Sequence, residues 1–172
     1  MLSKKIEEAL NAQINAELYS SYLYLSMSAY FKSINLDGFA NWMYVQAQEE
    51  LAHAIKFYNF INQKGGRIIL SAVEAPPTNW ISPLDAFEKT LEHEIKVTSL
   101  INNLLDIAIS EKDHSTSIFL QWFITEQVEE ESNAENIIKQ LKLTGDSNIS
   151  LFLIDRELAK RLFINPLNTQ ST

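Results

Sequence analysis

The sequence predicts an all-α fold: a four-helix bundle with one long crossover and a short fifth helix, forming a single domain over residues 1–172. Three observations support this prediction. The chain contains only four glycines and four prolines, too few for the many turns of an all-β protein. Apolar residues recur at helical spacing over long stretches. One long connection, residues 65–81, separates two pairs of these stretches.

The first two helices are expected over about residues 3–34 and 37–64. Between them, residues 35–38 (Asn-Leu-Asp-Gly) form a turn that contains capping residues. The second helix should stop at Gly65 and Gly66, because glycine after a helical stretch is typical of a helix C-terminus. These two helices therefore form the first helical hairpin.

The connection over residues 65–81 is too long for a hairpin turn, so we expect it to cross the length of the bundle. Ser82 and Pro83 then mark a helix start, because serine caps a helix and proline suits its first position. The third helix is expected over about 83–110 and the fourth over about 114–143. Two hairpins joined by one crossover complete the bundle.

A shorter fifth helix is expected over about residues 149–163. It opens with an apolar run, Ile149 to Ile154, that exceeds what one extra surface helix needs. Such an excess usually means burial against other subunits, so the sequence predicts a homo-oligomer. Residues 164–172 are expected to form a frayed polar tail.

The composition excludes several classes of function. The net charge is −8 and no basic patch stands out, so neither a nucleic-acid partner nor a membrane surface is expected. The absence of cysteine excludes disulfides, zinc–thiolate sites, iron–sulfur clusters and cysteine catalysis. No secretory signal and no membrane span is recognisable, so we expect a cytoplasmic protein.

Polar residues interrupt the apolar stripe of every long helix near its middle. They are Glu17 on the first helix, Glu49, Glu50 and His53 on the second, Glu94 on the third, and Gln127 and Glu130 on the fourth. One such residue could reflect an error of register. Four helices that share the pattern indicate a site.

The two halves of the chain repeat this pattern with a constant offset of 77 residues, which relates Glu17 to Glu94, Glu50 to Gln127, and His53 to Glu130. Measured from the two hairpin turns at a rise of about 1.5 Å per residue, all six lie within roughly 6 Å of one level. The sequence therefore predicts a pseudo-two-fold set of ligands around a common centre.

Metal is the expected partner of this set. Isolated buried carboxylates are costly, and the four stripes carry one histidine and no Lys or Arg to neutralise them. Oxygen ligands with a single imidazole suit iron or manganese. Glu50 and His53 form a Glu-x-x-His pair, whose spacing brings both side chains to one metal. A buried ion-pair network in an ordinary bundle is the competing interpretation, and the missing cations count against it.

The segments around these residues resemble the non-haem ferritins of bacteria and archaea. The resemblance extends over about residues 3–163. It is carried by NAELYSSYLYLSM (15–27), QEELAHA (48–54), EHE (92–94) and FLQWFITEQVEEE (119–131). It implies a ferritin-like bundle, a ferroxidase that oxidises Fe(II) to Fe(III) with O2 or H2O2, and iron storage as a ferric mineral inside a hollow shell of 24 subunits.

The resemblance also implies a role for each site residue. Glu17, Glu50 and His53 would hold one iron, and Glu50 would bridge to a second held by Glu94 and Glu130, with Gln127 beside it. A third iron position would be formed by Glu49, Glu126, Glu129 and Glu130. Tyr24 and Trp122 match the family's aromatic residues next to the site, which can supply electrons during oxidation.

Several roles stay open on the residues alone. Glu126 and Glu129 also fit a solvated helix face, and Gln127 fits a ligand, a hydrogen-bond donor or a mere neighbour. By spacing alone, Tyr24 and Trp122 are ordinary core aromatics.

A haem-containing bacterioferritin is the nearest competing function. The pattern typical of that family has a second Glu-x-x-His on the fourth helix and a methionine just before the second helix's histidine. Here Gln127-Val-Glu129-Glu130 stands on the fourth helix and Ala52 precedes His53, so no haem is expected. A di-iron carboxylate oxidase without storage, and a helical interaction module that binds no metal, also compete with the ferritin interpretation.

Overall fold

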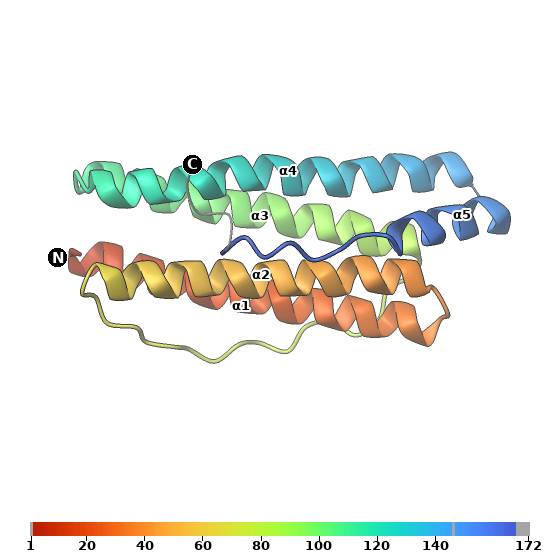
Figure 1. Ribbon diagram of the computed structural model, residues 1–172, viewed down its shortest axis with the longest axis horizontal. Helices are drawn as coiled ribbons and strands as arrows, with labels where there is room; N and C mark the ends of the chain where they lie inside the picture. The colour runs from red at the N-terminus through yellow and green to blue at the C-terminus, as the bar shows by residue number, and fades with distance from the viewer. Residues whose placement is uncertain (1, 146, 168–172) are drawn as a thin grey trace.

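The computed structural model describes residues 2–145 and 147–167 and contains five helices. They are α1 (Lys4–Ser33), α2 (Asp37–Gln63), α3 (Pro83–Ser110), α4 (His114–Thr144) and α5 (Asn148–Leu158). No strand occurs among the described residues, so the all-α prediction is confirmed. Figure 1 shows two antiparallel pairs, α1 with α2 and α3 with α4, packed against each other. The four long helices begin and end within one residue of the expected bounds.

The last helix is shorter than expected. The prediction that it continues to about residue 163 is wrong, because α5 ends at Leu158. The side-chain amide of Asn41 donates to the carbonyl oxygens of Leu158, Ala159 and Arg161, at 3.3, 3.4 and 3.0 Å. The last carbonyl groups of a helix have no i+4 donor, and Asn41 supplies one to the carbonyls of this terminus.

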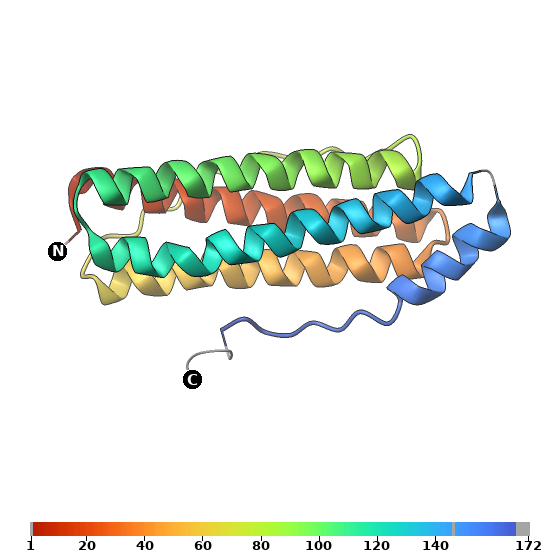
Figure 2. The same cartoon turned by 90° about the horizontal axis from the view of Figure 1, so that it is seen from above.

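The described residues that follow α5 stay packed against the bundle. Residues 164–167 were expected to belong to a polar tail, but Pro166 is buried. Figure 2 shows this extended stretch running back alongside α2. The remaining residues of the expected tail, 168–172, lie outside the described part of the chain.

A local side-chain cap is present at four of the five described helix starts, those of α3 and α4 among them. The hydroxyl of Ser82 accepts a hydrogen bond from the backbone N–H of Asp85 at 3.1 Å, as the predicted cap requires. Asp113 likewise accepts from the N–H of Thr116 at 3.1 Å and caps α4. These caps set the helix bounds that place the site residues at one level.

The start of α2 is capped from another helix. Leu36 provides no side-chain cap, and Oδ1 of Asp155 on α5 accepts from the N–H groups of Gly38 and Phe39 at 2.8 and 3.1 Å. The backbones approach closely here, because a Cβ atom built on Gly38 would lie 1.6 Å from the carbonyl oxygen of Asp155. Glycine is therefore required at this position for α5 to dock.

The crossover runs the length of the bundle along α1, as Figures 1 and 2 show. Polar side chains on the outer face of α1 hold its backbone. Asn11 donates to the carbonyl of Arg67 at 3.0 Å, and Tyr30 donates to the carbonyl of Trp80 at 2.8 Å. The expected crossover is therefore present and fixed at both ends.

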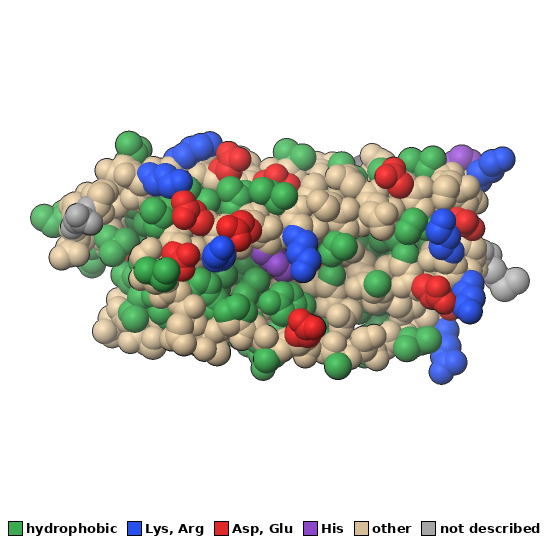
Figure 3. Space-filling model, turned by 180° about the vertical axis from the view of Figure 1, so that it is seen from behind, with side chains coloured by type: hydrophobic (Ala, Val, Ile, Leu, Met, Phe, Trp, Pro, Cys, Tyr) green, Lys and Arg blue, Asp and Glu red, His purple; other side chains and the backbone are tan. Residues whose placement is uncertain are grey.

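The apolar core consists of two clusters, one toward each end of the bundle. One contains Phe31, Phe39 and Phe87, and the other contains Phe57 and Phe123. Between them lies a layer of buried polar side chains. Acidic and basic side chains are interspersed on the face seen in Figure 3. None of the described helices combines the length and apolarity that a membrane span requires.

Candidate metal centre

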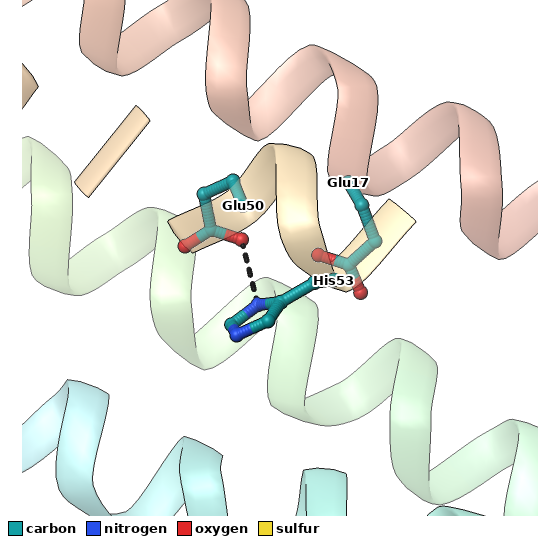
Figure 4. A group of neighbouring side chains, drawn as sticks. All are labelled: Glu17, Glu50 and His53. Atoms are coloured by element: carbon teal, nitrogen blue, oxygen red, sulfur yellow. Dashed lines mark hydrogen bonds and ion pairs between the residues drawn. The ribbon is translucent and has the colours of Figure 1, made fainter. Parts of the chain in front are cut away.

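Three side chains from two helices converge in the polar layer. Glu17 reaches in from α1, and Glu50 and His53 from α2 (Figure 4). One potential ligand atom from each lies within 4.8 Å of the others. All three are buried, with exposed fractions of 1%, 2% and 1%. Nδ1 of His53 lies 3.3 Å from Oε2 of Glu50.

The other half of the predicted set lies on α3 and α4. Glu94 and Glu130 are buried, at 1% and 4% exposed. The amide of Gln127 donates to Oε2 of Glu94 at 3.1 Å, and the hydroxyl of Tyr24 donates to Oε1 of the same carboxylate. In this structure Gln127 is thus a hydrogen-bond donor to a carboxylate of the site.

Two glutamines that the sequence did not predict as site residues donate to its carboxylates, and one of them, Gln46, joins the two halves. The amide of Gln46 donates to Oε1 of Glu50 at 3.0 Å and to Oε2 of Glu130 at 2.8 Å. The amide of Gln13 donates to Oε1 of Glu17 at 2.8 Å. Each glutamine stands four residues before a glutamate on the same helix face, a spacing that could have identified it.

The centre contains polar atoms that no protein group satisfies. Within the described residues, the buried side-chain atoms that lack a hydrogen-bond partner are Oε2 of Glu17, Oε1 of Gln46 and Nε2 of His53. A buried polar atom without a partner costs about 1–3 kcal/mol. Two acceptor oxygens and one ring nitrogen that lack a protein partner in this layer fit a site that binds a cation.

Burial raises the affinity of these carboxyl groups for protons. Desolvation, reinforced by the charge of Glu50, raises the pKa of Glu17 well above its usual value. Desolvation, followed by the charge of Glu94, does the same for the pKa of Glu130. The pKa of Glu94 is raised to about 8, again mainly by desolvation. In the described part of the chain no buried residue is a Lys or Arg, so no such cation offsets the charge of these carboxyl groups.

Glu50 and His53 behave as an ion pair. Burial works against both charges, but the imidazolium of His53 lowers the pKa of Glu50 below its usual value. Burial would also lower the pKa of His53, and the charge of Glu50 outweighs it and raises that pKa to about 10. The imidazolium therefore balances one of the four buried carboxyl groups, and the other three are left to protons or metal.

The remaining predicted acids lie at the edge of the centre. Glu49 is partly buried, and Glu126 places Oε1 3.9 Å from Nε2 of His53. Glu129 is exposed on α4. These three and Glu130 line one hollow of about 440 Å³ at the surface of the bundle. Burial raises the pKa of Glu49 to about 7, against the opposing charge of Arg161.

The two predicted aromatic residues lie beside different side chains of the centre. Tyr24 is fully buried, and its phenol lies against Glu94. The ring of Trp122 meets that of His53 edge-on, with centroids 5.4 Å apart. The ammonium group of Lys56 lies 3.5 Å from the centroid of the Trp122 ring. Each aromatic residue therefore contacts a side chain of the centre.

Comparison with known proteins agrees with this geometry. Residues 7–144 match the model of the ferritin-like domain. The chain is 45% identical to a bacterial non-heme ferritin of Bacteroides fragilis over 94% of this chain and 100% of that protein. It is 43% identical to a bacterial non-heme ferritin of Staphylococcus aureus over 95% and 98%. An open-pore ferritin from the archaeon Archaeoglobus fulgidus superimposes with a TM-score of 0.94 at 54% identity, covering 94% of this chain and 100% of that one.

Proposed function

Because this chain belongs to the ferritin family, we propose that it oxidises Fe(II) at the carboxylate-and-histidine centre and stores the ferric product inside a hollow shell of its own subunits. The A. fulgidus, B. fragilis and S. aureus relatives are named as ferritins, the bacterial ones as non-heme. Their similarity extends over nearly the whole of each chain. Fe(II) is thus the substrate, and no haem is required.

The observation that carries this proposal is the unsatisfied polar layer. Glu17, Gln46 and His53 each present a buried atom without a partner among the described residues, and burial raises the pKa of three neighbouring carboxyl groups. A bound cation would satisfy such atoms and stabilise the charged carboxylates. Hard oxygen donors with one imidazole favour iron in this setting.

Glu17, Glu50 and His53 are assigned to the first Fe(II). Glu50, Glu94 and Glu130 are assigned to the second, so that Glu50 serves both. The carboxylates stabilise the charge that grows as each iron is oxidised. Gln127 and Gln46 hold these carboxylates in place by hydrogen bonds of 2.8–3.1 Å. O2 or H2O2 takes up the electrons.

A third iron position is assigned to Glu49, Glu126, Glu129 and Glu130, which line the hollow beside the centre. It lies closer to the surface than the first two, in line with a place that iron passes through. Tyr24 and Trp122 are assigned as electron donors, since one contacts Glu94 and the other His53.

The storage role requires a shell. The apolar run at the start of α5 leaves Ile149, Phe152 and Leu153 exposed by 76%, 58% and 60% in the single chain, which supports burial between subunits. A shell of 24 subunits and a cytoplasmic location are what the family implies.

The test is anaerobic loading of the metal-free protein with Fe(II), followed by exposure to O2. Absorbance of the ferric product and iron retained per chain are recorded. We expect fast oxidation with iron retained far beyond the three proposed positions. Glu50→Ala should slow the first oxidation by about a hundredfold or more, because loss of a supporting residue alone costs about 10–100-fold.

Glu8→Ala is the matched control, because Glu8 is an exposed glutamate on α1 that pairs with the exposed Lys4. It should oxidise and retain iron as the wild type does. If oxidation stops once the proposed positions are filled, the metal centre would be supported and the storage role would be contradicted. A wild-type rate in Glu50→Ala would overturn the centre itself.

A further inference from the structure

The stretch after α5, residues 159–167, is here named the C-terminal strap. It runs back along the bundle beside α2, on the side that α4 shares (Figures 1 and 2). Asn41 on α2 donates to its carbonyl oxygens at Ala159 and Arg161, and Pro166 is buried. The strap is therefore held at both ends.

The strap places one cation over the centre. A guanidinium nitrogen of Arg161 lies 2.5 Å from Oε2 of Glu49, and the two side chains are only 20% and 17% exposed. The guanidinium carbon lies 4.3 Å from the centroid of the Trp42 ring, and the group also donates to the carbonyl of Trp42 at 3.4 Å. Three contacts thus fix a positive charge that arginine cannot lose by deprotonation.

This charge lies at the proposed third iron position. The hollow of about 440 Å³ has the carboxylates of Glu49, Glu126, Glu129 and Glu130 on one side. The strap supplies Arg161, Leu162, Ile164 and Pro166 on the other. Arg161 is the one cationic side chain among the described residues that line it.

We propose that Arg161 is a built-in competitor for the third cation, and that the strap is displaced when a multivalent cation binds there. This inference rests on the proposed function. A cation that binds Glu49 must break a partly buried, charge-assisted hydrogen bond, which is among the strong ones. The third position is thereby weakened most, because Arg161 bonds directly to Glu49, whereas its charge acts on Glu130 of the second position without a hydrogen bond.

The consequence is an order of filling. Ions bind first at the two buried iron positions. They bind at the third position only when they displace the guanidinium of Arg161 from Glu49. An ion there is then released readily, because Arg161 returns to Glu49. The strap favours transit of iron over its retention beside the centre.

The test is calorimetric titration of the assembled, metal-free protein with Zn²⁺, which is redox-inert. In Arg161→Gln the third step should tighten by about tenfold, which corresponds to about 1.4 kcal/mol. The two tight steps per chain should change far less, because Arg161 bonds to Glu49 and only its charge acts on Glu130. Lys160→Gln is the matched control, because Lys160 is the adjacent cation, 71% exposed, and pairs with Glu157. It should leave all steps as in the wild type.

A third step that is unchanged in Arg161→Gln, or equally tightened in Lys160→Gln, would overturn the competitor role. If the wild-type protein shows no two tight binding steps per chain, the di-iron assignment on which the proposal rests would be contradicted. Hydrogen exchange gives a second readout in unaltered protein. Amides of residues 159–167 should exchange faster at saturating Zn²⁺, and unchanged protection would overturn the displacement. Arg161→Lys keeps a charge at this position and should tighten the third step less than Arg161→Gln.

Discussion

The side-chain amide of Gln46 donates a hydrogen bond of 2.8 Å to Oε2 of Glu130, and so joins α2 to α4 across the centre of the bundle. The same nitrogen donates to Oε1 of Glu50 at 3.0 Å. One neutral side chain thus orients two of the carboxylates that we assign to iron. Residues that orient metal ligands in this way commonly matter nearly as much as the ligands.

Replacing Gln46 by Leu should slow the first oxidation of Fe(II) by about 10–100-fold, because the two carboxylates lose their common donor. Stopped-flow absorbance of the ferric product measures this rate. Gln121→Leu, at an exposed position on α4, should oxidise at the wild-type rate. Equal rates in the two variants would show that Gln46 only fills space.

Replacing Tyr24 by Phe should remove a radical signal that follows oxidation. The phenol of Tyr24 donates to Oε1 of Glu94, and the charge of that carboxylate, after burial, raises the phenol pKa well above its usual value. Freeze-quenched electron paramagnetic resonance after mixing with O2 detects the radical. Tyr58→Phe, at an exposed tyrosine on α2, should retain the signal. Persistence of the signal in Tyr24→Phe would exclude Tyr24 as the donor.

The stability of the metal-free protein should fall as the pH rises between about 5 and 8. Glu94 has a folded pKa of about 8 against 4.5 for an ordinary glutamate, so the folded state binds the extra proton in this window. Stability decreases with pH wherever the folded state binds more protons than the unfolded state. The raised pKa values of Glu17, Glu130 and His53 act in the same direction.

Urea unfolding of the metal-free protein at about pH 5 and about pH 8 measures this slope. Glu94→Gln should flatten it, since that side chain no longer titrates. Zn²⁺ binding at neutral pH should release protons, and fewer in Glu94→Gln. A stability that rises with pH over this window would contradict the protonation that we assign to the centre.

Replacing Gly38 by Ala should detach α5 from the bundle. The added Cβ would lie 1.6 Å from the carbonyl oxygen of Asp155, so backbone must move. The cap that Asp155 supplies to α2 would be lost as well, at a cost of about 0.5–2 kcal/mol. Thermal unfolding and proteolysis within the last helix report the change.

Two variants of Asp155 separate the cap from the docking. Asp155→Asn retains an oxygen that can accept from the N–H groups of Gly38 and Phe39, so it should lose little stability. Asp155→Ala removes the acceptor and should lose about 0.5–2 kcal/mol. If all three variants are as stable as the wild type, α5 does not depend on this contact.

The sequence by itself determined the four long helices and the level of the site within them. A repeat of apolar residues at helical spacing identifies the buried face of each helix, and the rise per residue converts positions into heights. The spacing alone therefore places Glu17, Glu50, His53, Glu94 and Glu130 together. Those rules are local, and they suffice for features that depend on the sequence of a single helix.

Only the tertiary structure decided which atoms meet between helices. The bonds from Gln46 to Glu130, Asp155 to the start of α2, and Arg161 to Glu49 join residues 84, 117 and 112 positions apart. Such contacts depend on how each helix is rotated and shifted against its neighbours. A local sequence pattern does not determine that rotation or shift. The end of α5 also involves another helix, because Asn41 on α2 donates to the carbonyl oxygens of Leu158 and Ala159, which have no helical i+4 donor.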